Sequence, residues 1–353
     1  MEIHPRFELN GLSLNGEALQ EVAYSWVKEG KDFEKSAGDF LLDWFSPSEF
    51  LIVSTSGSTG TPKPIELRKE FMVNSAMTTG KYFDLNPGDA ALLCLSADFI
   101  AGKMMLVRAM VLGLHLDIVP ADSSPLNGRS KVYDFAAMVP LQVDNSLNEL
   151  KKVKKLIIGG AAIAHGLKEQ LSKLTNAIYE TYGMTETITH IAVKKISNTD
   201  QDKSEKYFET LPGVKINKDR RDCLVINAPS ISTEMVITND LVDIIDEGHF
   251  KWLGRFDNVI NSGGVKLIPE QIEEKLATII SNRFFVIGLK DETLGEKLVL
   301  VVEGNKQTEL RASISSLTTL SKYEMPKAIY FLPKFLETDS GKVMRSKTIT
   351  TLI

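Results

Sequence analysis

One segment of the chain combines hydroxyls, glycines and a lysine directly after the apolar run of residues 50–53: Ser54-Thr55-Ser56-Gly57-Ser58-Thr59-Gly60-Thr61-Pro62-Lys63. Gly57 and Gly60 can adopt backbone angles closed to other residues, so main-chain N–H groups can approach a polyphosphate there. The hydroxyls and Lys63 add donors and a positive charge. The apolar run predicts a strand, and the segment predicts a phosphate-binding loop at its end. A flexible serine- and glycine-rich linker is the alternative for this segment taken alone.

The loop does not fit the Walker A pattern of P-loop nucleotidases. That pattern places Lys and then Ser or Thr directly after its last glycine. Here Thr61 and Pro62 follow Gly60, and Pro64 follows Lys63. A kinase or GTPase of the P-loop type is therefore not indicated.

The composition is typical of a soluble, globular, cytoplasmic protein. The chain has 353 residues, of which 43% are hydrophobic and 25% charged, and a net charge of -5. This length predicts roughly two or three domains. Cys94 and Cys223 are the only cysteines, and each lies in an apolar stretch. We therefore expect both in the core, with neither a disulfide framework nor a thiolate metal site.

We expect neither an export signal nor a membrane span. The N-terminus lacks a long apolar stretch, and the most hydrophobic region, residues 90–116, is interrupted by Asp98, Lys103 and Arg108. The mildly acidic net charge does not indicate binding of nucleic acid. The lysines of residues 151–155 indicate a solvated helix end before a strand rather than a binding patch.

The first part of the chain alternates short apolar runs with helical patterns, which predicts a layered α/β domain. We expect strands at 51–53, 90–95, 116–119, 156–158 and 177–181, helices at 68–83 and 102–112, and a surface loop at 120–130. The apolar run 132–139 can be helix or strand.

The pattern changes after residue 198. Residues 223–226, 234–238 and 250–253 predict antiparallel strands of a small β subdomain. A last unit, α+β in character, begins near residue 256. It has a helix at 269–280 opened by Pro269, a helix at 310–320, and strands at 285–289, 298–302 and 328–332. We therefore expect domains at 1–254 and 255–353.

Further clusters carry groups suited to nucleotide chemistry. Tyr182-Gly183-Met184-Thr185-Glu186-Thr187 places a glutamate beside hydroxyls, and a carboxylate can hold Mg²⁺ through oxygen. Asp240 follows a β-run and could pair with ribose hydroxyls. Arg255 and Asp257 precede the glycine pair Gly263-Gly264, and Lys342 lies on a polar loop. Each also has an ordinary structural interpretation, as a turn, a cap or a solvated surface charge.

Together and in this order, these motifs resemble the adenylate-forming superfamily of acyl-CoA synthetases, aryl-acid ligases and luciferases. The resemblance covers about residues 54–347. It implies a compact adenylate-forming fold of the α/β class: a layered α/β N-terminal domain with a small β subdomain, and a mobile α+β C-terminal domain. It also implies ATP, Mg²⁺ and CoA as cofactor and cosubstrates.

The resemblance assigns roles residue by residue. Thr185 and Glu186 match the pair that contacts the α-phosphate and Mg²⁺, Lys342 matches the lysine of adenylation, and Asp257 matches the hinge of the C-terminal domain. The implied contacts with the phosphates of ATP are Thr55, Ser56, Gly57, Ser58, Thr59, Gly60 and Lys63 in the phosphate loop. Gly160, Ala161 and Tyr182 would lie around adenine and the acyl pocket, Asp240 at the ribose, and Arg255 at the ribose or a phosphate. Gly263 and Gly264 would approach pantetheine, and Lys266 would contact a phosphate. Asn239 departs from the family pattern, in which glycine usually precedes the acid.

Such residues suit the attack of a carboxylate on the α-phosphate, in which two anions must approach each other. Lysine, Mg²⁺ and loop donors would neutralise charge in that transition state. The acyl-adenylate formed is a mixed anhydride, so the family closes the site and then turns the C-terminal domain to admit a thiol.

The short region before the phosphate loop and the segment of residues 95–105 look most like o-succinylbenzoate-CoA ligases of menaquinone biosynthesis. This substrate has two carboxylates and an aromatic ring, which predicts a cation in an apolar pocket. Phe99 would supply an apolar wall, Gly102 would leave room, and Lys103 would hold the unreactive carboxylate. Lys103 can equally be a surface residue at a helix N-terminus. His190 would line the same pocket or be a hydrogen-bonded core histidine.

Other functions stay open at this point. Within the class, the chain could activate another aryl or fatty acid, or transfer the acyl group to a carrier-protein thiol. Outside it, the short N-terminal region allows a non-catalytic nucleotide-binding protein. Retention of Glu186 and Lys342 together argues against that. Family members commonly dimerise, which leaves a homodimer open.

Overall fold

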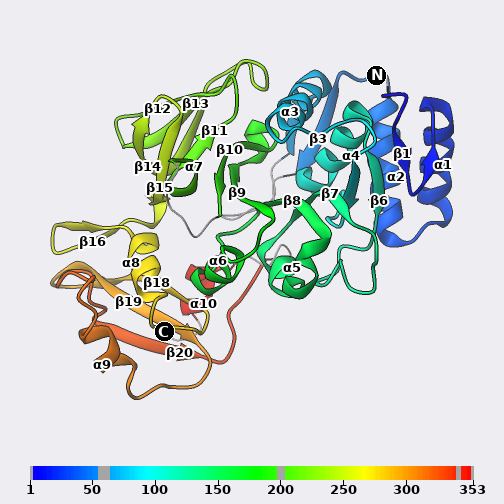
Figure 1. The fold of residues 1–353 in the computed structure, drawn as a ribbon. Coiled ribbons are helices and arrows are strands. Elements are labelled where there is room, and N and C mark those ends of the chain that lie inside the picture. The colour runs from blue at the N-terminus through cyan, green and yellow to red at the C-terminus, as the bar shows by residue number, and fades with distance from the viewer. Residues whose placement is uncertain (1–2, 55–63, 197–202, 339–342, 351–353) are drawn as a thin grey trace.

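The computed structural model describes residues 3–54, 64–196, 203–338 and 343–350. Most of the strands belong to one sheet, in the order β12-β13-β14-β15-β11-β10-β9-β8-β7-β5-β6-β1-β2. A smaller sheet near the C-terminus has the order β17-β16-β19-β18, with β20 beside β19. Figure 1 shows the smaller sheet and its helices, in yellow to red, below the larger part of the molecule. The α/β fold class predicted from the sequence is confirmed.

The centre of the large sheet is parallel. Its strands are β5 (Ala90–Leu93), β6 (His115–Ile118), β7 (Tyr133–Met138), β8 (Val153–Ile158) and β9 (Ala177–Gly183), with β1 (Glu8–Leu9) and β2 (Leu12–Ser13) at one edge. Residues 132–139, open between helix and strand, form β7. Its side chains are almost all buried, as in a parallel strand covered on both faces.

Two hydrophobic clusters cover the two faces of this sheet. Successive residues of a strand enter different clusters: Leu93 and Phe135 belong to one, and Leu92 and Ala136 to the other. This alternation follows from the two-residue repeat of a strand. Cys94 and Cys223 are free and buried, as predicted.

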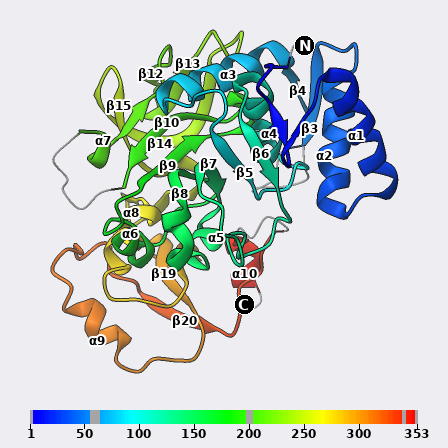
Figure 2. The ribbon, with the colours of Figure 1, turned by 45° about the vertical axis from the view of Figure 1, so that its right-hand side comes forward.

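Helices pack on this sheet and beyond its edge. They are α1 (Gly16–Glu29), α2 (Asp32–Phe45), α3 (Lys69–Tyr82), α4 (Ile100–Leu112), α5 (Pro140–Asp144), η1 (Leu147–Lys152) and α6 (His165–Leu171). The lysines of residues 151–155 lie at the end of η1 and the beginning of β8, as predicted. The pair α1 and α2, which the sequence analysis did not identify, packs together beyond the sheet edge (Figure 2). Asn15 begins α1 by accepting a hydrogen bond from the Ala18 N–H at 2.9 Å.

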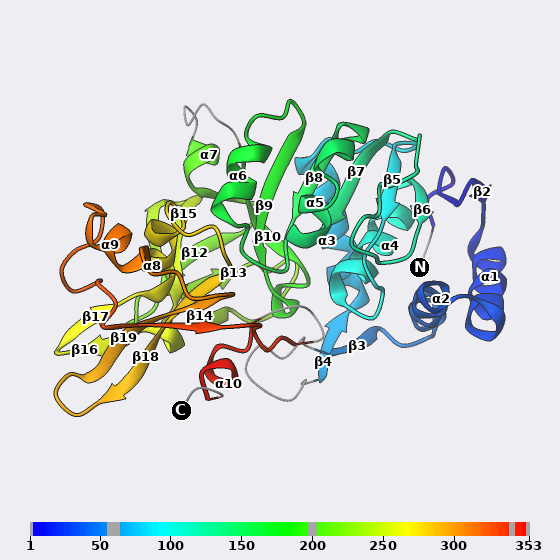
Figure 3. The same ribbon diagram turned by 90° about the horizontal axis from the view of Figure 1, so that it is seen from below.

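The antiparallel part of the large sheet forms the predicted β subdomain. Its elements are β10 (His190–Lys195), α7 (Lys203–Lys206), β11 (Phe208–Thr210), β12 (Lys215–Lys218), β13 (Cys223–Asn227), β14 (Val236–Asp246) and β15 (His249–Arg255). The strands β3 (Phe50–Ser54) and β4 (Pro64–Arg68) pair separately (Figure 3). The predicted strand before the phosphate loop is therefore present.

The C-terminal unit has its own hydrophobic clusters. Its elements are η3 (Phe256–Asn258), β16 (Ile260–Ser262), β17 (Val265–Leu267), α8 (Pro269–Leu276), β18 (Phe284–Asp291), β19 (Gly295–Glu303), α9 (Leu310–Ser315), β20 (Ala328–Leu332) and α10 (Arg345–Thr350). Helices α8 and α9 end several residues earlier than predicted. Runs of β-branched residues follow both ends and disfavour the next helical turn. The domain boundary at residue 254 and the mobility of this unit stay predictions.

In the part of the chain that the structure describes, every helix is too short or too polar to cross a bilayer.

Candidate active site

Several predicted site residues lie outside the described part of the chain. They are Thr55, Ser56, Gly57, Ser58, Thr59, Gly60, Lys63 and Lys342. The residues that flank them are placed: Ser54 pairs with Pro64 at the end of β3 and β4, and Glu337 pairs with Val343.

Thr185 and Glu186 form part of the short helix η2 (Thr185–Thr187), directly after β9. The turn is fixed by Thr187, whose buried hydroxyl accepts from the Met184 N–H at 3.0 Å. Ile188 has a φ of 64°, an unusual conformation for a β-branched residue. Glu186 is exposed, and its carboxylate makes no hydrogen bond or ion pair within the described residues. Binding of Mg²⁺ by Glu186 stays a prediction, and the described residues contain no cluster of three or more His, Cys, Asp and Glu side chains.

The carboxyl end of β8 lies beside the carboxyl end of β9 and carries the predicted Gly160 and Ala161. Gly160 has a φ of 85°. A Cβ on the preceding Gly159 would lie 2.5 Å from Thr181 Oγ1. The backbone therefore turns tightly at the edge where ligands of parallel sheets commonly bind.

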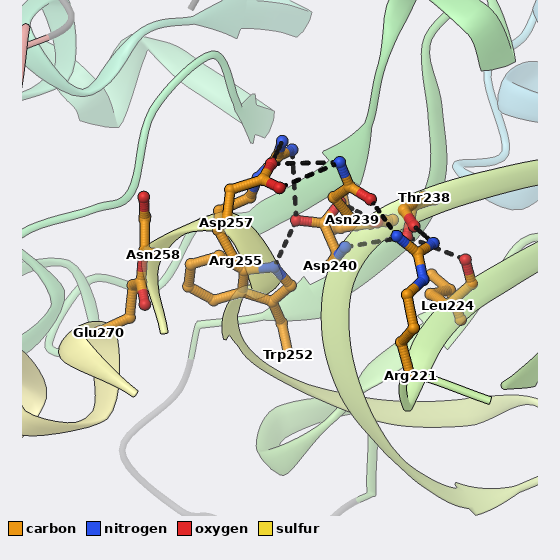
Figure 4. A network of polar contacts seen from close by, with 11 residues as sticks. Arg221, Leu224, Thr238, Asn239, Asp240, Trp252, Arg255, Asp257, Asn258 and Glu270 are labelled. Carbon is orange, nitrogen blue, oxygen red and sulfur yellow. Dashed lines mark hydrogen bonds and ion pairs between the residues drawn. The ribbon is translucent and has the colours of Figure 1, made fainter. Parts of the chain in front are cut away.

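Asp240 and Tyr182 are in direct contact. The Tyr182 hydroxyl donates to Asp240 Oδ2 at 2.8 Å, and the indole of Trp252 donates to Oδ1 at 3.0 Å. Figure 4 shows Trp252 and Arg255 converging on this carboxylate. Arg255 Nη1 lies 3.8 Å from Oδ1. Burial, together with Asp240, raises the pKa of Tyr182 well above its ordinary value, so the phenol stays protonated and remains a donor.

The expected position of Asp240 after a strand was wrong. Strand β14 continues through it to Asp246, because Asp240 and the residues after it pair with β15, while Val236 and Ile237 before it pair with β13. The Tyr182 ring packs against Phe208 and Phe250, with centroid distances of 5.9 and 5.2 Å. Its contact with adenine stays a prediction.

Asp257, the predicted hinge, is held from several sides. Asn239 Nδ2 donates to its Oδ2 at 3.1 Å, and Arg255 Nη2 lies 3.1 Å from the same oxygen. Arg221 in turn donates to Asn239 Oδ1 at 2.7 Å (Figure 4). Asn239, the residue that departs from the family pattern, thus connects β14 to the start of the C-terminal unit.

Gly263, Gly264 and Lys266 lie on the hairpin of β16 and β17. The two glycines have φ values of 59° and 82°, the left-handed angles that a tight hairpin turn of this type requires. Lys266 is exposed. In Figure 1 strand β16 of this hairpin is at the outer flank of the C-terminal unit, away from β9.

The predicted acyl-pocket residues have mixed environments. Phe99 precedes α4 and is 42% exposed. A Cβ on Gly102 would lie 2.2 Å from the carbonyl oxygen of Ser96, so backbone fills the space that was expected to be open for substrate. Lys103 Nζ lies 5.2 Å from the ring centroid of Phe40 in α2. Burial lowers the pKa of Lys103 below its ordinary value, and the nearby acids Asp98, Asp43 and Asp39 offset this only in part.

His190 is a buried, hydrogen-bonded core residue. Its Nε2 lies 3.4 Å from Thr79 Oγ1, and its Nδ1 lies 3.3 Å from Thr189 Oγ1. Burial and the charge of Arg108 lower its pKa well below the ordinary value. The ring is therefore neutral at pH 7, and the core alternative fits its environment.

Arg108 is a candidate that the sequence analysis did not select. It is 1% exposed, its Nη2 lies 3.3 Å from Thr189 Oγ1, and its Nε has no partner within the described residues. None of the described carboxylates forms an ion pair with it, and burial lowers its pKa to about 9. The available signal was a single arginine in the otherwise apolar second half of α4.

The model of the AMP-binding enzyme family matches residues 20–217 of this sequence. The chain belongs to the AMP-binding enzyme family. The predicted enzyme class and the resemblance to adenylate-forming enzymes are thereby confirmed.

Curated relatives within this family include the 2-succinylbenzoate–CoA ligases of Bacillus cytotoxicus and Salmonella typhimurium. The first is 26% identical over 349 residues, covering 86% of this chain and 71% of that protein. The second is 25% identical over 330 residues, covering 88% of this chain and 71% of that protein.

Solved structures of AMP-binding enzymes share the fold. An acyl-CoA synthetase (AMP-forming)/AMP-acid ligase II-like protein from Dyadobacter fermentans is 37% identical, covering 95% of this chain and 98% of its own, with a TM-score of 0.61. The O-succinylbenzoate Coenzyme A Synthetase of Bacillus subtilis, in complex with ATP and magnesium ion, is 19% identical. The match covers 84% of this chain and 69% of that structure's chain, with a TM-score of 0.71.

Proposed function

We propose that this AMP-binding enzyme is a cytoplasmic acid–thiol ligase that converts o-succinylbenzoate, ATP and CoA to o-succinylbenzoyl-CoA, AMP and diphosphate, in menaquinone biosynthesis. The names of curated relatives at about 25% identity support the substrate. One feature of the chain itself supports it further: Arg108 is a buried guanidinium without an acidic partner among the described residues.

A buried, unpaired cation is energetically unfavourable, and a bound carboxylate relieves that cost. Arg108 contacts Thr189, which follows the Thr185–Glu186 turn by a few residues. An acid with one carboxylate at the α-phosphate and a second carboxylate deeper in the protein suits this placement. o-Succinylbenzoate has two carboxylates, whereas benzoate and fatty acids have one.

In the proposed reaction the acid attacks the α-phosphate of ATP. Thr185 contacts that phosphate, and Lys342 neutralises the charge that develops on it. Mg²⁺, when bound through Glu186, supplies further positive charge at the phosphates. Asp240 and Arg255 hold the ribose, and Tyr182 lies against adenine. The phosphate-loop residues Thr55, Ser56, Gly57, Ser58, Thr59, Gly60 and Lys63 hold the outgoing diphosphate.

CoA then attacks the acyl-adenylate in the second half-reaction. We propose that the C-terminal unit turns about Asp257 to admit the thiol, which brings Gly263, Gly264 and Lys266 from their present flank toward pantetheine. This turn breaks the contacts of Asp257 with Asn239 and Arg255 seen here.

The test incubates the protein with ATP, Mg²⁺ and CoA and one acid at a time: o-succinylbenzoate, benzoate or a medium-chain fatty acid. Diphosphate release and the mass of the thioester are measured. We expect selective turnover of o-succinylbenzoate, and loss of turnover in Lys342→Ala with ATP binding retained. Turnover of another acid would keep the mechanism and overturn the substrate. A labelled carrier protein in place of CoA would identify a carrier-protein ligase, and no turnover with any acid would favour a non-catalytic protein.

A further inference from the structure

Strand β15 contains a one-residue bulge opposite β14. Leu241 pairs with Gly254, whereas the next residue, Val242, pairs with Trp252. Leu253 therefore has no partner across the ladder. Directly opposed residues share a face of the sheet, so the bulge moves Trp252 to the face of Val242. Alternation along β14 places Asp240 on that same face.

Without the bulge, Trp252 would be opposite Asp243 and would point to the other face. With it, the indole Nε1 donates to Asp240 Oδ1 at 3.0 Å (Figure 4). Tyr182, from the neighbouring part of the sheet, donates to Oδ2 at 2.8 Å. Two neutral donors thus fix both oxygens of a carboxylate that is only 6% exposed.

The bulge has a structural requirement of its own at Gly254. This residue has a φ of 152°, and a Cβ there would lie 2.4 Å from Glu270 Oε2 and 2.6 Å from Ile268 Cγ2. The φ therefore strongly favours glycine at that position, and any other residue would also require the side chains of Glu270 and Ile268 to shift. The glycine, the bulge and the indole donor form one local arrangement.

We propose that Trp252 is a positioning residue for nucleotide recognition. It does not contact the nucleotide but holds the Asp240 carboxylate in the plane that receives both ribose hydroxyls. Each carboxylate oxygen has a further acceptor direction beyond the one used by Trp252 or Tyr182. The ability to distinguish ribose from a sugar without hydroxyls then depends on the indole N–H. This inference rests on the ribose role proposed above for Asp240.

The experiment measures calorimetric binding of AMP and of 2′,3′-dideoxy-AMP, which needs no turnover. In Trp252→Phe we expect AMP affinity to fall about 5- to 10-fold, the effect of one hydrogen bond of about 1 kcal/mol, with dideoxy-AMP affinity almost unchanged. The wild-type preference for AMP should shrink by the same factor. A benzothiophene isostere of tryptophan at residue 252 keeps the ring shape, removes only the N–H, and should give the same result if Trp252→Phe folds poorly. Trp26→Phe, in α1, is the matched control and should keep the full preference.

Asp240→Asn separates the inference from the proposal beneath it. If Asp240→Asn keeps the preference for AMP, the ribose role of Asp240 is wrong. If Asp240→Asn loses the preference while both residue-252 variants keep it, Asp240 binds ribose and the positioning role of Trp252 is wrong. Equal loss of affinity for both nucleotides in the residue-252 variants would indicate a merely structural role and would also overturn the inference.

Discussion

Replacing Arg108 with methionine should stabilise the protein and impair binding of its acid at the same time. Burial lowers the pKa of Arg108 from 12.5 to about 9. At 1.36 kcal/mol for each pKa unit, this gap corresponds to a cost of about 5 kcal/mol for keeping the guanidinium charged in the folded protein. Because the folded pKa is lowered, the full cost applies at pH 7 and is relieved only as the pH rises through about 9.

Arg108→Met removes that cost, keeps most of the apolar volume of the side chain, and loses weak hydrogen bonds to Thr189 and Met105 of about 1 kcal/mol each. We therefore expect a gain of about 3 kcal/mol in the free energy of unfolding, measured by urea denaturation at pH 7. The KM for o-succinylbenzoate should rise about 10- to 100-fold, the effect of a lost charge-assisted hydrogen bond.

Arg311→Met is the matched control, because Arg311 is exposed on α9 and its replacement should change neither quantity. A loss of stability in Arg108→Met, with equal losses of activity on every acid that the enzyme turns over, would refute the reasoning. Arg108 would then be a structural residue of α4.

Three further predictions concern stability. Gly254→Ala should lower the free energy of unfolding by about 2 kcal/mol or more in urea denaturation, because its φ is strained for alanine and the added Cβ would press on the Glu270 side chain. Gly166→Ala is the control: a Cβ at Gly166 would meet no atom within 4 Å, so the free energy of unfolding should not fall in this way. Burial lowers the pKa of His190 below 6.5, so the wild-type protein should lose stability as the pH falls from 7 to 5, and His190→Asn should lose less. Burial raises the pKa of Glu273 to about 7 despite its ion pair with Arg345, so stability present near pH 4.5 should be lost progressively as the pH rises to 7. Glu273→Gln should flatten that dependence. If the pH dependence of stability is unchanged in His190→Asn or in Glu273→Gln, the replaced side chain does not titrate as described.

Many of the strands and helices after residue 50 could be predicted because apolar runs and glycine-rich turns report local structure directly, whereas α1 and α2 were not identified. The run 132–139 illustrates the limit of this signal. An apolar run of this length fits a strand or a buried helix, and only the neighbouring strands β5 and β8 make it a strand.

The candidate site was less visible, because its decisive contacts join residues distant in the sequence. Asp240 was selected, but its donors Tyr182 and Trp252 are brought to it by sheet pairing and by a bulge that the residue pattern of β15 does not show. Arg108 was noted only as a break in an apolar region. Its burial depends on the sheet and helices packed around α4, which single-sequence patterns do not describe.

Transfer of oxygen from the acid to AMP tests the central claim most directly. The reaction is run with o-succinylbenzoate labelled with ¹⁸O in both carboxylates, and AMP and diphosphate are examined by mass spectrometry. If the carboxylate attacks the α-phosphate and CoA then displaces AMP, each AMP carries one ¹⁸O and the diphosphate carries none. Label in diphosphate, or thioester formation with unlabelled AMP, would contradict an acyl-adenylate intermediate.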